Sequence, residues 1–109
     1  MANAFKTYTA NTIGFEVTNI NTTAGGATET IIGLTLANVT TGAVEANVTV
    51  ANTSGSLHRI VANAPIAKGG ALVPIGGEQK IVMEAGCSIK VSTNTANSVD
   101  VILSVLKQT

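Results

Sequence analysis

Hydrophobic and polar residues alternate along most of this chain, the pattern of a β-strand that buries one face. The clearest example is Val44–Asn52, in which most odd-numbered residues are polar and Val44, Ala46, Val48 and Val50 are apolar. Thr28–Val39 alternates in a similar way, and the apolar residues of Cys87–Ser92 share one parity. No stretch has a clear period of 3.6 residues, so the pattern favours strands throughout.

The remaining strands are shorter and are separated by turn signals such as paired glycines and runs of Asn, Thr and Ser. They are predicted at Phe5–Thr9, Phe15–Ile20, Leu57–Asn63, Ala71–Ile75, Gln79–Glu84 and Ser98–Lys107. About eight or nine short strands at this spacing are typical of a sandwich or small barrel. We therefore predict an all-β fold, a single antiparallel β-sandwich of jelly-roll-like form.

Two prolines and a short repeat refine this prediction. Pro74 lacks a backbone donor, which places its strand at a sheet edge, and Pro65 is expected to end the strand before it. Ala-Asn-Val-Thr occurs at residues 37–40 and again at 46–49. We interpret the two copies as the arms of a hairpin that turns at Thr41-Gly42.

Shared parity within each strand also predicts which side chains form the core, because a slip of one residue would expose the whole set. The predicted core is Ile32, Leu34, Leu36, Val44, Val48, Val50, Ile81, Ile89, Val91, Val99, Val101 and Leu103.

Composition narrows the functional classes. The 109 residues are 45% hydrophobic and 11% charged, with a net charge of zero. This excludes a disordered chain, which pairs low hydrophobicity with high charge. Five scattered Lys and one Arg cannot make a phosphate-tracking stripe, so no nucleic-acid partner is expected. The opening residues do not resemble a secretion signal, and no apolar run could span a membrane. We expect a complete chain made in the cytosol, with no membrane partner.

Candidate catalytic chemistry is sparse. The chain has one His, one Cys, one Asp and no Trp. His58 and Arg59 are interpreted as structural or interface residues, with a pH-sensitive contact as the alternative. Cys87 alternates with Ile89 and Val91 and is expected to be a small buried hydrophobe. We predict no catalytic residue, no cofactor and no metal site, and therefore not an enzyme.

Several strand-and-turn segments resemble a recurring type of small virion protein of tailed bacteriophages. They are Val48–Gly55, Gly76–Gly86 and Ser98–Val105, within a region from about Val44 to Leu106. Cys87 stands where those relatives often have an acidic residue. The resemblance implies a β-sandwich mounted on a phage particle as a head-decoration, neck or tail accessory protein, and it carries over no functional residue.

Low charge and a full set of strands favour a non-enzymatic virion structural protein, first of all a capsid decoration or cement protein. Such a protein would be located in the virion, self-associate as a homo-oligomer and bind a major capsid or other virion protein. The alternative is a tail or neck accessory protein, or a receptor- or glycan-binding tip module. The scarcity of aromatic rings counts against a sugar site, because such rings often stack on ligands.

Five residues are predicted to form contacts with partners. Phe5, Tyr8 and Phe15 are all of the aromatic residues and lie within eleven positions of one another. Ile102 and Leu106 have the parity opposite to the core residues of the last strand. Residues 1–10 are expected to be either an arm that docks on a neighbouring subunit or a first edge strand, and residues 11–109 the sandwich domain.

Overall fold

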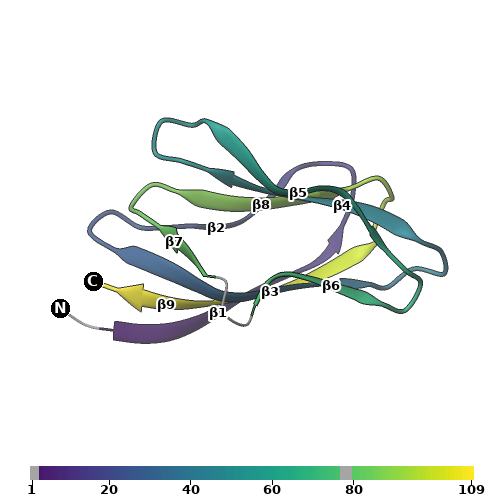
Figure 1. The fold of residues 1–109 in the computed structure, drawn as a ribbon, viewed down its shortest axis with the longest axis horizontal. Coiled ribbons are helices and arrows are strands. Elements are labelled where there is room, and N and C mark those ends of the chain that lie inside the picture. Colours follow the sequence, from purple (N-terminus) through teal and green to yellow (C-terminus); the bar gives the residue numbers. More distant parts are fainter. Residues whose placement is uncertain (1–2, 77–79) are drawn as a thin grey trace.

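The computed structural model describes residues 3–76 and 80–109, which form nine strands and no helix. The strands pack as two antiparallel layers (Figure 1). Their bounds are β1 Asn3–Ile13, β2 Thr18–Thr22, β3 Thr28–Asn38, β4 Val44–Ala51, β5 Leu57–Ile66, β6 Ala71–Ile75, β7 Ile81–Met83, β8 Ser88–Thr93 and β9 Val99–Gln108. The all-β sandwich prediction is confirmed.

The two layers differ in their strand order. In sheet A the order is β1-β9-β3-β6, with β7 also paired to β3, and in sheet B it is β2-β8-β4-β5. Successive strands mostly cross from one sheet to the other, so strands that are neighbours in space are distant in sequence. This connectivity is that of a jelly roll with β7 as an additional strand. In Figure 1, β4, β5 and β8 lie in the upper layer, and β1, β3, β6 and β9 in the lower layer.

The core lies between the sheets and consists mainly of branched aliphatic side chains. Nine of the twelve predicted core residues are buried there, and Val50 and Ile81 are partly buried against it. The prediction for Ile32 is wrong, because the register between β3 and β9 shifts between Ile31 and Gly33. This bulge reverses the parity, so Ile31 is buried together with Leu34.

The predicted hairpin at Thr41-Gly42 is also wrong, since β3 belongs to sheet A and β4 to sheet B. The side chain of Asn38 explains the crossing between sheets. Its amide donates to the carbonyl oxygens of Gly42 (2.8 Å), Ile66 (3.0 Å) and Ala67 (3.2 Å). These bonds tie the start of the β3–β4 connection to the end of β5.

Of the predictions for the two prolines, one is confirmed and the other is wrong. Pro74 lies in β6 at the edge of sheet A, as predicted. The prediction that Pro65 ends a strand is wrong, because it lies inside β5, opposite Glu45. Since β5 is the edge of sheet B, a residue without a backbone donor is tolerated there. The strand predicted at Gln79–Glu84 is observed as Ile81–Met83, and Gln79 lies outside the described residues.

Replacement of Val48 tests the assignment of the core face. Val48 is fully buried in β4, so Val48→Asp places an unpaired carboxylate between the sheets. The cost is at least about 3 kcal/mol, a large part of the stability of a small domain. We expect loss of soluble folded protein, measured by expression yield and thermal unfolding. Thr49→Asp on the opposite face is the matched control, and a Val48→Asp protein with an unchanged Tm would contradict the assignment.

Candidate interaction surface

The outer face of sheet A carries a row of side chains that crosses four strands. The register pairs Phe5 of β1 with Leu106 of β9, Leu106 with Thr30 of β3, and Thr30 with Val82 of β7. Directly opposed residues in an antiparallel sheet share a face, with Cβ atoms about 5 Å apart. Phe5 is 77% exposed and Val82 61%. The row therefore presents apolar groups to solvent.

A second row runs parallel to the first. It consists of Thr9, Ile102 and Thr35, which are opposed in the same way, and Ile102 is 51% exposed. Val73 of β6 is a further exposed apolar residue at the edge of this sheet. We call the outer face formed by Phe5, Ile32, Val73, Val82, Ile102 and Leu106 the apolar face.

Charge is scarce on the apolar face. Among the described strand residues whose register places them on this side, Asp100 is the one ionisable group. Between the apolar side chains lie Thr, Ser and Gly residues, which are inexpensive to desolvate compared with charges. A face with few charged groups and several exposed large apolar groups is the kind of surface that monomeric proteins rarely leave in water.

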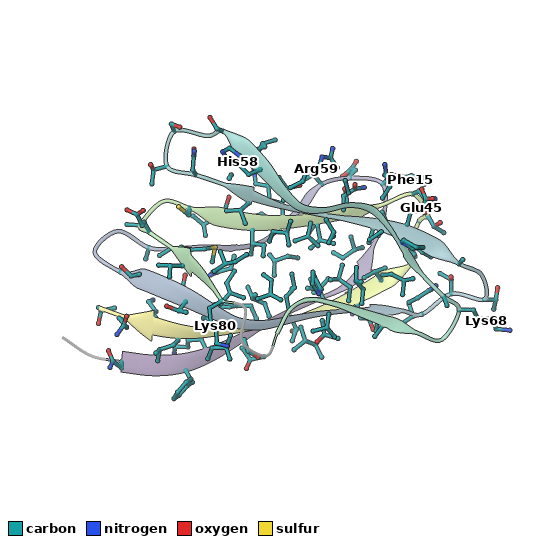
Figure 2. The ribbon with its side chains drawn as sticks, viewed as in Figure 1. Phe15, Glu45, His58, Arg59, Lys68 and Lys80 are labelled. Atoms are coloured by element: carbon teal, nitrogen blue, oxygen red, sulfur yellow. The ribbon has the colours of Figure 1, made fainter. Side chains whose placement is uncertain are left out.

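The structure brings three of the five predicted contact residues together and separates the other two. Phe5, Ile102 and Leu106 lie on the apolar face. Tyr8 is opposed to Leu103 and so points inward, where it packs against the core. Phe15 is 68% exposed in the connection between β1 and β2, and Figure 2 places it beside the upper sheet near Glu45. Their roles as contact residues stay predictions.

Sequence reasoning missed Val73 and Val82. Parity could have found Val82, because it lies between Ile81 and Met83, which both face inward. No comparable signal existed for Val73, since the register between β3 and β6 shifts between Leu34 and Leu36.

Tyr8 belongs to a polar cluster inside the sandwich. Its hydroxyl donates to Oε2 of Glu29 at 3.2 Å, and the Asn21 side-chain amide donates to Oε1 at 2.8 Å. Glu29 is only 1% exposed. The cluster joins β1 and β3 of sheet A to β2 of sheet B. Burial raises the pKa of Tyr8 above its ordinary value of 10.0, and the negative charge and hydrogen bond of Glu29 raise it further.

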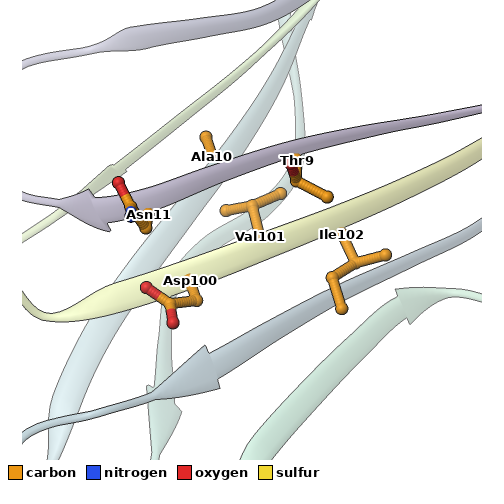
Figure 3. Close-up of a pocket in the computed structure, with 6 residues that line it drawn as sticks. All are labelled: Thr9, Ala10, Asn11, Asp100, Val101 and Ile102. Carbon is orange, nitrogen blue, oxygen red and sulfur yellow. The ribbon is translucent and has the colours of Figure 1, made fainter.

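A shallow cavity of about 340 Å³ lies beside the apolar face, where β1 leaves β9 (Figure 3). It is lined by Thr9, Ala10, Asn11, Asp100, Val101 and Ile102. The register shifts here between Ala10 and Ile13, and the backbone amide of Thr12 donates to Oδ1 of Asp100 at 3.2 Å. The lining offers one carboxylate and no second acid–base group beside it.

The outer face of sheet B is different in character. The register opposes Asn19, Lys90, Thr49 and Arg59 across four strands. A hollow of about 150 Å³ lies over this row and is lined by Val17, Thr49, Leu57, Arg59, Lys90 and Ser92. Nη1 of Arg59 donates to Oδ1 of Asn47 at 2.6 Å, which holds the guanidinium group over the sheet. The lining thus contains two cations, two hydroxyls and no carboxylate.

The other residues considered for chemistry are dispersed. His58 is exposed on β5, and Cys87 is a free, buried thiol packed in the core. Within residues 3–76 and 80–109, no three His, Cys, Asp or Glu side chains gather as a metal site. The same residues include no helix with the length and hydropathy needed to cross a membrane.

Three chains of solved structures are similar to this protein. No protein-family model matches the chain, and no curated protein matches it. A chain in the structure of infectious bursal disease virus, Gt strain, is similar over 97% of this chain, with a TM-score of 0.48 and 10% sequence identity. This protein spans 32% of that chain. The resemblance to bacteriophage proteins stays a prediction.

The Tyr8–Glu29 hydrogen bond predicts a dependence of stability on alkaline pH. Because the pKa of Tyr8 is raised, the folded state favours the neutral phenol. Its contribution is fully present below pH 10 and is lost as the pH rises through the raised value. Tyr8→Phe should lower the free energy of unfolding at pH 7 by about 1 kcal/mol.

Urea unfolding at pH 7 and near pH 11 measures both effects. The loss of stability between the two values should be smaller in Tyr8→Phe than in the wild type. Phe5→Leu, which changes an exposed ring on the same strand, is the control. Equal losses in Tyr8→Phe and the wild type would show that Tyr8 does not contribute.

Proposed function

We propose that this protein is a non-enzymatic structural component of a virion, a capsid decoration protein that self-associates and binds a major capsid or other virion protein. The observation that carries the proposal is the apolar face of sheet A, which is almost free of charge. A surface of this kind is stable when it is covered by a permanent partner.

Three further points support the proposal. The strand-and-turn segments of the sequence resemble small virion proteins of tailed bacteriophages. The chain is poor in charge, which fits a protein whose surface is largely in contact. Jelly rolls are used by viral capsid proteins and also by lectins, so the fold admits this role without establishing it. The residues on the apolar face make the proposal specific, because they identify the side chains that would contact the partner.

Ile102 and Leu106 are the residues with which to test it. Burying both side chains is worth roughly 3 kcal/mol per subunit before the costs of association, at about 25 cal/mol per Å². Ile102→Ser with Leu106→Ser should therefore give a folded protein that associates less and binds particles less. Light scattering measures the mass, and sedimentation with particles assembled without the protein measures binding.

The matched control removes exposed apolar groups from the other sheet, with Val17→Ser and Leu57→Ser. This control protein should keep both its mass and its particle binding. If Ile102→Ser with Leu106→Ser changes neither quantity, the apolar face is not the contact. Labelling of bound protein by electron microscopy distinguishes a head location from the tail or neck location of the alternative role.

The hollow on sheet B favours a second candidate function, a receptor- or glycan-binding module. Lys90 and Arg59 flank the hydroxyl of Thr49, and the lining holds no carboxylate to neutralise them. This arrangement suits the sulfate or carboxylate group of an acidic glycan.

Lys90→Ala with Arg59→Ala should then weaken binding of a sulfated oligosaccharide by at least about tenfold, given the strength of charge-assisted hydrogen bonds. Titration calorimetry at low and high salt measures the affinity. Lys68→Ala, which removes an exposed cation from the β5–β6 connection, is the control. A wild-type protein that binds no acidic glycan at millimolar concentration would exclude this second function.

A further inference from the structure

The described strands at the sheet edges are β1, β2, β5, β6 and β7, because β6 and β7 both pair with the side of β3 away from β9. All of them except β1 are poorly suited to pairing with another strand, and β7 has only three residues. β6 is five residues long and contains Pro74. β5 contains Pro65, and its register to β4 shifts twice. β2 is five residues long and has a shift between Asn19 and Asn21. Short length, prolines and bulges are among the features by which proteins prevent edge-to-edge association.

β1 lacks these features. It pairs with β9 through eight consecutive residues, Asn3–Ala10, without a register shift, and this segment contains neither Pro nor Gly. Its other side has no neighbour in sheet A. No described strand pairs with the backbone groups on that side, so they form a regular ladder of donors and acceptors that is a template for a further strand.

We propose that two copies of this chain pair edge to edge through β1, antiparallel about a twofold axis at Thr7. The pairing would join the two five-stranded sheets A into one sheet. The inference rests on the self-association in the proposed function and specifies its geometry. An isologous antiparallel contact of this kind closes on itself, so it gives a dimer and not a fibre.

Charge disfavours one register and favours the proposed one. Opposed residues share a face, so the axis falls on a residue and not between two residues. An axis at Lys6 would place Lys6 against its own copy, with like charges directly opposed, which is destabilising. An axis at Thr7 opposes Lys6 to Tyr8 of the second copy. The ammonium group would then lie near an aromatic ring whose hydroxyl is bound to Glu29, a favourable arrangement.

The same register joins the apolar faces of the two copies. With the axis at Thr7, Phe5 is opposed to Thr9 of the second copy. Thr9 is itself the neighbour of Ile102, and Phe5 is the neighbour of Leu106. The row across the contact would therefore run from Leu106 and Phe5 of one copy to Thr9 and then Ile102 of the other. The paired strands would present one continuous apolar surface to a virion partner.

Disulfide trapping tests the register directly. In a Cys87→Ala background, Thr7→Cys places two thiols directly opposite each other, and mild oxidation should link the copies. In Thr9→Cys the two thiols would be four residues apart along the strands, about 13 Å, which is beyond disulfide reach. We expect a covalent dimer for Thr7→Cys and none for Thr9→Cys. Equal linking of both variants, or of neither, would overturn the proposal.

A second experiment uses charge at the axis. Thr7→Lys opposes two ammonium groups and should raise the dimer dissociation constant at least about tenfold, with partial recovery in high salt. Thr35→Lys adds the same charge to the same face two strands away and is the control. Sedimentation velocity measures association, and an unchanged Tm verifies folding. A Thr7→Lys protein that dimerises as the wild type does would overturn the proposal.

Different experimental results would contradict the edge pairing and the proposed function. If the edge pairing is wrong but the proposed function is right, Thr7→Lys leaves association unchanged while Ile102→Ser with Leu106→Ser still reduces particle binding. If the proposed function is wrong, the wild-type protein does not bind particles, whatever the outcome of disulfide trapping.

Discussion

The structure depends on one constraint, that each strand can bury only one of its two faces. The two sheets meet through their inward side chains, which are mostly Val, Ile and Leu, with no Phe in the core. A core of branched aliphatic residues is flat enough for two pleated sheets to pack closely. The polar cluster of Tyr8, Asn21 and Glu29 is the exception, and its hydrogen bonds fix β1 and β2 relative to β3.

The same alternation explains what could be predicted from the sequence. Parity identified most of the core, because the period of two is a property of the strand itself. It failed at Ile32, where a bulge adds a residue that the sequence does not mark. The hairpin interpreted from the repeat at 37–40 and 46–49 was wrong for a similar reason. The side chain of Asn38, at the point where the chain passes to the other sheet, is hydrogen-bonded to residues such as Ile66, which is distant in sequence. Strands that pair with each other are distant in sequence, and no local sequence pattern identifies the partner strand.

For the predicted contact residues too, the sequence indicates which face of its strand a side chain lies on, but not which strands are neighbours. The outward parity of Ile102 and Leu106 was evident from their own strand. Their proximity to Phe5 depends on β1 pairing with β9, which joins the two ends of the chain. The clustering of aromatic residues in the sequence did not imply clustering in space, because Tyr8 points inward and Phe15 lies in a connection. The hollow on sheet B was not predicted at all, since Arg59 and Lys90 are opposed to the same Thr49 only through the sheet.

The jelly-roll order also determines which strand remains open. β1 is the edge strand of sheet A, so it pairs with β9 on one side and with no described strand on the other. At the other three edges, proline, short length or a bulge limits pairing. An edge that is long and regular would favour aggregation if it were simply left exposed. Because two copies of Lys6 directly opposite each other would repel, the edge resists the register with its axis at Lys6, whereas the proposed axis at Thr7 opposes no like charges.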